Sequence, residues 1–185
     1  MVEKPNSARE LKEDGLRLFQ EGLYEEAIDS FEAAREMFSA EDDNLEAAEM
    51  TNNIGVIYRL QGRWDEAIAA LEEAREVFVR IEDRNREAQA LGNLGGLYAS
   101  QGELDKALEA LRQAADIFAD LGDDQRHGEI LLALGVQKWK AGDRGAGLAI
   151  YEAGLQTLEE ATIGQRILRG LFKLRNRLLG GGTSD

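Results

Sequence analysis

Cysteine is absent from the 185 residues, and histidine and proline occur once each, as His127 and Pro5. Without cysteine there is no disulfide and no thiolate metal ligand, and a lone histidine is too little for a histidine-based metal site or catalytic pair. No nucleophile–base pair, phosphate-binding loop or metal-ligand spacing is visible either. The sequence therefore predicts a protein that is not an enzyme and that carries no cofactor and no metal.

Long apolar runs are also missing. No stretch approaches the roughly 20 consecutive apolar residues that a membrane-spanning helix needs. The N-terminal residues, MVEKPNSARELKEDG, lack the apolar centre of a signal peptide. We therefore expect a soluble, cytoplasmic protein.

Positive charge is scarce over most of the chain. Residues 1–160 carry 17 basic and 35 acidic side chains, whereas residues 163–179 carry five basic and no acidic ones. Such an acidic body should repel nucleic acid. Two interpretations of it stay open, a surface that attracts a basic partner or a solvated face that keeps an elongated protein soluble.

What the chain does contain is a repeat. Residues 52–74 read NNIGVIYRLQGRWDEAIAALEEA and residues 92–114 read GNLGGLYASQGELDKALEALRQA, and without a gap the two are identical at ten of 23 positions and exchange only isoleucine for leucine at three more. The same frame extends outward, since glycines recur every forty residues at Gly15, Gly55, Gly95 and Gly135, and at Gly22, Gly62, Gly102 and Gly142. A fixed period of this length predicts stacked units that bury their apolar surfaces against one another. Four copies fill most of the chain.

Each copy divides at its second glycine into two segments with apolar residues three and four apart, which predicts two antiparallel helices. Caps for the first helix of copies two to four recur forty residues apart, at Asp43, Asp83 and Asp123. The spacing of a capping box occurs at Ser7 and Glu10, at Asp43 and Glu46, and at Thr162 and Gln165. The last of these opens a ninth and final helix.

The order Asn, Leu, Gly, Tyr, a turn glycine and then alanines closely resembles the tetratricopeptide repeat (TPR). The forty-residue period looks like the longer subclass found in spindle-orientation adaptors and kinesin light chains. The resemblance covers about residues 8–160 and implies an all-α solenoid of four helix pairs plus a C-terminal capping helix. The expected segments are a flexible N-terminus at 1–6, TPR 1 at 7–42, TPR 2 at 43–82, TPR 3 at 83–122, TPR 4 at 123–161, an amphipathic capping helix at 162–179 and a disordered tail at 180–185.

The fourth copy departs from the pattern. Gly147 and Gly154 stand where the middle copies have alanine, and with Gly145 they place three glycines in one helix. Each should cost roughly 1 kcal/mol relative to alanine in a helix interior. The fourth repeat is then either soft or built for unusually close helix approach.

In TPR proteins the first helix of each pair lines the concave side, so the resemblance implies a peptide-binding groove there. Its lining would be Lys12, Leu16, Phe19, Asn52, Asn53, Val56, Arg59, Gln89, Gly92, Asn93, Gly96, Ala99, Leu132, Val136, Trp139 and Lys140. Asn53 and Asn93 stand where related long-repeat proteins present asparagines to the backbone of an extended peptide, and an amide both donates and accepts. The alternative is that these asparagines bond neighbouring helices or face water.

The size of these side chains varies along the groove. Large apolar residues at both ends enclose the small Gly92, Gly96 and Ala99, a trough that suits a bulky apolar side chain or a helix. The alternative is that some of the large residues pack against neighbouring repeats. Lys12 and Asn53 also match the two-carboxylate clamp of chaperone-binding TPR proteins, but the second cationic cluster is missing, so we do not expect that binding mode.

The last helix carries two apolar stripes and a basic face. One stripe contains Ile163, Ile167, Leu171, Leu174 and Leu178, the other Leu168, Phe172 and Leu179, and the basic face Arg166, Arg169, Lys173 and Arg177. A cap on the open end of a solenoid needs only one stripe. The surplus marks Ile167, Leu168, Leu171, Phe172, Arg169 and Lys173 as a candidate oligomer or partner surface. A membrane contact is disfavoured by the acidic body.

These features together predict a non-catalytic adaptor or scaffold that binds a peptide or amphipathic helix of another protein, basic or apolar in character. The alternative is a structural scaffold that forms homo-oligomers through the C-terminal helix, and head-to-tail contacts would let it grow open-ended. Nucleic acid is not expected as a partner.

Overall fold

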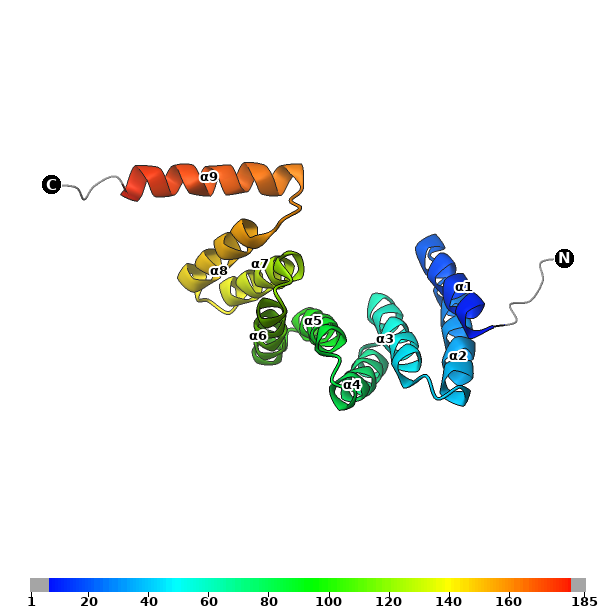
Figure 1. The fold of residues 1–185 in the computed structure, drawn as a ribbon. Coiled ribbons are helices and arrows are strands. Elements are labelled where there is room, and N and C mark those ends of the chain that lie inside the picture. The colour runs from blue at the N-terminus through cyan, green and yellow to red at the C-terminus, as the bar shows by residue number, and fades with distance from the viewer. Residues whose placement is uncertain (1–6, 181–185) are drawn as a thin grey trace. The chain divides into compact units, whose positions relative to one another are not determined.

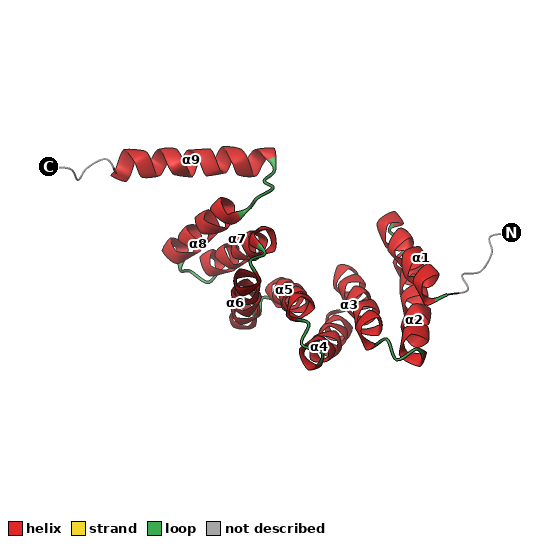
Figure 2. Cartoon of the chain, in the orientation of Figure 1, coloured by secondary structure: helices red, strands yellow, loops and turns green. Residues whose placement is uncertain are grey.

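A computed structural model describes residues 7–180, and for residues 176–180 it describes the backbone alone. This part of the chain folds into helices joined by short turns, without strands (Figure 2). The helices are α1 (Ala8–Glu21), α2 (Tyr24–Ala40), α3 (Asn44–Leu60), α4 (Trp64–Arg80), α5 (Arg84–Gln101), α6 (Leu104–Leu121), α7 (Asp124–Lys140), α8 (Arg144–Thr157) and α9 (Ile163–Gly180) (Figure 1). The predicted flexible N-terminus at 1–6 and residues 181–185 of the predicted tail lie outside the described residues, whereas Gly180 ends α9.

Two compact units make up the chain, Met1–Gln101 and Gly102–Asp185. The first unit contains α1 to α5 and the second contains α6 to α9, and within each unit every helix packs against the next one along the chain. The division falls inside the third copy of the repeat, between its two helices.

The helix boundaries follow the signals expected from the sequence. Asp43, Asp83 and Asp123 each accept a hydrogen bond from the backbone amide three residues later, at 3.2, 3.0 and 2.9 Å. Thr162 and Gln165 form the predicted capping box at the start of α9, with bonds of 2.7 and 3.3 Å in the two directions. The turn glycine of the second copy, Gly62, has a φ of 73°, which disfavours any side chain there.

One predicted capping box is only half formed. The Asp43 carboxylate caps α3 as expected, but the side chain of Glu46 does not return to the Asp43 amide. It accepts a 2.6 Å bond from Lys12 Nζ on α1 instead, because a cation on a neighbouring helix is a stronger partner than a backbone amide.

The core of the repeats is as periodic as the sequence. Phe38, Phe78 and Phe118 are each 2% exposed, and Leu158 takes the fourth of these positions at 3%. Burying such a side chain fully contributes roughly 1.5–3 kcal/mol. Alanine at the close-approach position of the second helix is fully buried in the first three copies, and Gly147 replaces it in the fourth. The repeats therefore stack through layers that recur every forty residues.

Within residues 7–180, no helix is both long enough and apolar enough to cross a membrane.

Candidate functional site

A polar pocket of about 200 Å³ lies between α1, α3, α4 and α5 in the first unit. Its lining comprises Lys12, Leu16, Glu49, Asn52, Asn53, Phe78, Arg86 and Gln89. Five of these residues, Lys12, Leu16, Asn52, Asn53 and Gln89, belong to the groove predicted from the sequence. They meet because they occupy the same face of three successive first helices.

Alternating charges run across this polar pocket. Lys12 Nζ lies 2.6 Å from Glu46 Oε2 and 2.7 Å from Glu49 Oε2. On the other side of Glu49, the Arg86 guanidinium lies 2.5 Å from Glu49 Oε1 and 2.8 Å from Asp83 Oδ2. The five side chains form one continuous network from α1 through α3 to α5.

The pKa values of the network reflect this pairing. Burial by itself would raise the pKa of Glu49, but the hydrogen bonds from Lys12 and Arg86 outweigh it and hold that pKa below its ordinary value. Burial would likewise lower the pKa of Lys12, and the bonds to Glu46 and Glu49 reverse the effect and raise it. Both cations are thus already neutralised by carboxylates of the same chain, which argues further against a clamp for two ligand carboxylates.

The two asparagines of the predicted ladder have different surroundings. Asn93 donates from Nδ2 to Oδ1 of Asn52 on α3, at 3.4 Å. Asn53 is half-buried and lines the polar pocket, and its amide has no hydrogen-bond partner within the described residues. The amide of Asn53 is therefore open to a ligand, while that of Asn93 makes a long bond to a neighbouring helix.

Other residues of the predicted groove belong to the apolar core of the first unit. Phe19 packs beside the cluster around Phe31 and lies 6.0 Å from the Tyr24 ring, centroid to centroid. Val56 packs against the cluster around Leu71. The alternative considered for the large groove residues, packing against neighbouring repeats, applies to Val56, whose cluster includes Leu94 and Leu97 of the next repeat. The Phe19 ring, by contrast, contacts Tyr24 of its own repeat.

The remaining groove residues of the first unit lie outside the polar pocket. Arg59, Gly92 and Gly96 are half-buried, and the Arg59 Nε atom is shielded from solvent without a partner in the described structure. Beside Gly96 there is open space.

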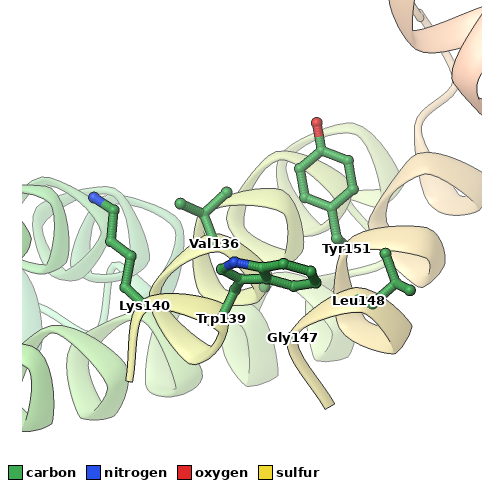
Figure 3. A pocket seen from close by; sticks show the side chains of 7 residues that line it. Val136, Trp139, Lys140, Gly147, Leu148 and Tyr151 are labelled. Carbon is green, nitrogen blue, oxygen red and sulfur yellow. The ribbon is translucent and has the colours of Figure 1, made fainter. Parts of the chain in front are cut away.

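The second unit holds the other predicted groove residues. Val136, Trp139 and Lys140 line a pocket of about 230 Å³ between α7 and α8, here called the α7–α8 pocket, and its remaining lining is Gly135, Gly147, Leu148 and Tyr151. The Trp139 indole lies at its centre, with Val136 on the same helix and Leu148 and Tyr151 on the facing one (Figure 3). Leu132 is half-buried and lies outside this lining. The two ends of the predicted trough thus belong to different units.

The last helix uses its two apolar stripes differently. Leu168 and Phe172 are half-buried, whereas four residues of the first stripe are exposed: Ile163 by 70%, Ile167 by 61%, Leu171 by 57% and Leu174 by 51%. We call these four residues the α9 stripe. The side chains of Arg177, Leu178 and Leu179, also assigned from the sequence, lie outside the described part. Lys173 is exposed, whereas Arg169 turns inward from the basic face and donates to the Leu158 carbonyl at 2.9 Å.

Sequence reasoning missed Glu49 and Arg86. A signal for both was available, because Lys12, Glu49 and Arg86 alternate in charge at a spacing of 37 residues. That spacing is one repeat minus about one helical turn, which brings side chains of adjacent first helices together. Searching for opposite charges at this offset would have found the network.

Stacked antiparallel helix pairs with a forty-residue period define an all-α solenoid, the class of protein to which this chain belongs. The family model described as tetratricopeptide repeat matches residues 15–78 and 46–120, together more than half of the chain. The chain is therefore a member of the tetratricopeptide repeat family.

Among solved structures, the chain is similar to BtubC (BKLC) from P. vanneervenii, with a TM-score of 0.75 and 22% sequence identity. The match covers 81% of this chain and 62% of BtubC, so the chain spans less than two thirds of that protein. At this identity the likeness establishes the fold alone. No curated protein matches the chain.

Proposed function

We propose that this protein is a non-catalytic adaptor that binds an extended peptide of another protein at the polar pocket of the first unit. TPR proteins commonly mediate contacts between proteins, and the forty-residue period supports placing the chain in the longer-repeat subclass. The observation that carries the proposal is the open amide of Asn53, which is held beside a charge network that is already paired.

The lining indicates what kind of peptide fits. Asn53 can both donate to and accept from a peptide group, which recognises backbone without selecting a sequence. Leu16, 38% exposed, supplies an apolar wall for one side chain. Because Lys12 and Arg86 are neutralised by Glu46, Glu49 and Asp83, the pocket offers no excess positive charge. We therefore infer a peptide that is apolar or basic rather than acidic.

The test is selection from a displayed library of random peptides, followed by calorimetric titration of the enriched sequences. We expect wild-type protein to enrich related apolar or basic sequences, and Asn53→Ala to bind them roughly five- to 150-fold more weakly, since an unmade hydrogen bond costs about 1–3 kcal/mol. The control is Ser39→Ala, which removes an exposed hydroxyl at the end of α2. Enriched peptides that bind Asn53→Ala as tightly as wild type would place the binding surface elsewhere.

A second candidate function is supported by α9. Its exposed stripe exceeds what a cap requires, and an exposed apolar row of this kind usually marks an interaction surface. Self-assembly through α9 would make the protein a structural scaffold. Sedimentation of the purified chain over a range of concentrations tests this candidate, and a monomer throughout would remove it.

A further inference from the structure

The contact between one repeat and the next is best defined in the first unit. There, Leu94 and Leu97 of α5 pack against a cluster of α3 and α4 that contains Val56, Ile68 and Leu71. Leu94 is 3% exposed and Leu97 is fully buried. The first helix of a repeat therefore packs on an apolar docking surface that the preceding helix pair forms.

In the described part of the chain, the equivalent docking surface at the end of the second unit is not covered by a following helix. Eighty residues after Val56, Ile68 and Leu71 stand Val136, Leu148 and Tyr151, and these three line the α7–α8 pocket. Val136 is 38% exposed, and its neighbour Trp139 is 48% exposed. Of the described residues of α9, none lines this pocket.

The helix that follows this docking surface in the chain, α9, also has exposed apolar residues. Leu174 of the α9 stripe stands eighty residues after Leu94, so it holds the position of a first helix that faces the preceding pair, and Leu171 lies three residues before it on the same stripe. Leu94 is 3% exposed, whereas Leu174 and Leu171 are 51% and 57% exposed. Both halves of one repeat-to-repeat contact therefore stand open in the same chain.

We propose that the α9 stripe of one copy docks in the α7–α8 pocket of a second copy, and that the second copy does the same in return. The result is a two-fold symmetric dimer with two equivalent contacts. This inference rests on the second proposed function, self-assembly through α9, and it names the acceptor surface.

The contacts of α9 with its own unit favour a second copy as the occupant. Arg175 Nη2 lies 2.5 Å from Glu152 Oε2 on α8, and Arg169 bonds the Leu158 carbonyl. The connection before α9 is held too, because Gln125 accepts a 3.0 Å bond from the Glu160 amide. If α9 turned into the pocket of its own chain it would lose these bonds, whereas a second copy reaches the exposed stripe without breaking them.

Pocket size and charge define the character of the contact. The volume of about 230 Å³ exceeds the roughly 150 Å³ of a cavity that accommodates benzene, so a leucine side chain fits. Lys140 borders the pocket, and Arg166 and Lys173 lie beside the α9 stripe. Apolar burial rather than attraction of opposite charges must then drive association, and added salt should strengthen it.

Sedimentation equilibrium of the full chain and three variants tests the proposal. Leu171→Glu puts a charge on the stripe, Val136→Glu puts one at the pocket, and Val79→Glu puts one at a similarly exposed apolar site on α4 as the control. We expect wild type and Val79→Glu to dimerise alike, and the other two to dimerise at least roughly tenfold more weakly. Circular dichroism verifies that each variant folds.

Mixing the two weakened variants sharpens the result. Each alone lacks both productive contacts, but a mixed dimer has one contact with an intact pocket and an intact stripe, so mixing should restore part of the association. Loss of the dimer in Leu171→Glu but not in Val136→Glu keeps self-assembly through α9 and overturns the pocket as acceptor. A wild-type chain that stays monomeric overturns both, and so does a dimer that neither variant weakens.

A disulfide trap separates a second copy from the same chain. Because the chain has no cysteine, the double variant Leu148→Cys, Leu174→Cys carries only the introduced thiols. Oxidation should give a covalent dimer on a non-reducing gel. A disulfide formed within one chain would show that α9 closes on its own pocket and would overturn the proposal.

Discussion

A methyl group added to Gly147 on α8 would stand 2.7 Å from the carbonyl oxygen of Gly135 on α7 and 2.6 Å from the backbone nitrogen of Trp139 on the same helix α7. The backbones of the two helices touch here because neither glycine carries a side chain. A second such contact joins Gly154 to Gly128, where the corresponding distance is 2.8 Å. The fourth repeat is thus the closely packed alternative expected from its glycines.

Two glycines of α8 should respond to alanine in opposite ways. Gly147→Ala forces the helices apart, and we expect it to lower the free energy of unfolding by about 1–3 kcal/mol. Beside Gly145 there is open space, so Gly145→Ala should raise that free energy by up to about 1 kcal/mol through helix propensity alone. Urea unfolding of both variants checks this, and equal effects would mean that α7 and α8 are not in backbone contact.

The sequence predicted the helices, their caps and their stacking because each of these is set by local spacing and by the repeat. It identified the glycines of α8 without deciding their role, since whether a glycine weakens a helix or admits a neighbour depends on the facing residue. Gly135 is that residue for Gly147, and only the folded chain shows them in register.

The candidate site was predicted less completely. Lys12, Asn53 and Gln89, all assigned to one groove from the sequence, line one pocket, but the partners of Lys12 were not foreseen. A side chain of this length reaches several positions on the next helix, so its choice of Glu46 and Glu49 depends on tertiary geometry. Phe19 and Val56 were assigned to the groove because first-helix position alone does not tell a groove wall from a packing contact.

The connections between repeats offer a second stability prediction. Glu82 has a left-handed backbone with a φ of 59°, and forty residues later Gly122 has a φ of 69°. A residue with a side chain costs roughly 1–2 kcal/mol in the left-handed backbone conformation. Replacing it with glycine removes this cost, but the greater freedom of glycine in the unfolded chain offsets part of the gain. We expect Glu82→Gly to raise the melting temperature and Gly122→Glu to lower it. Shifts of the same sign would contradict this account.

The charge network of the polar pocket should give a defined pH dependence. The pKa of Glu49 is lowered in the folded state, so its contribution is complete above the ordinary value of 4.5 and disappears as pH falls through the folded value. The pKa of Lys12 is raised, so its contribution is complete below 10.5 and disappears as pH rises through the folded value. Between about pH 5.5 and 9.5 the network is intact.

Glu49→Gln removes the central carboxylate of this network. Near neutral pH we expect it to lower the free energy of unfolding by about 1–2 kcal/mol, because Lys12 and Arg86 both lose a charged acceptor. As pH falls below 4.5 and through the lowered folded pKa of Glu49, the difference from wild type should shrink, since the wild-type carboxylate then becomes protonated. Glu66→Gln, whose exposed carboxylate pairs with Arg63, is the control and should change stability little at either pH. A Glu49→Gln effect that is constant with pH would contradict the assignment.

The ion pair between Arg175 and Glu152 should decide how firmly α9 is held. The Glu152 side chain is only 12% exposed, so removing its cationic partner leaves a largely buried carboxylate at the base of α9. We expect Arg175→Ala to speed amide hydrogen exchange across α9 by roughly tenfold, the factor that corresponds to about 1.4 kcal/mol of lost docking energy. Arg166→Ala removes an exposed arginine of the same helix and should leave exchange unchanged. If both variants exchange at the wild-type rate, the ion pair does not hold α9, and its docking rests on the half-buried Leu168 and Phe172 and on the bond from Arg169 to the Leu158 carbonyl.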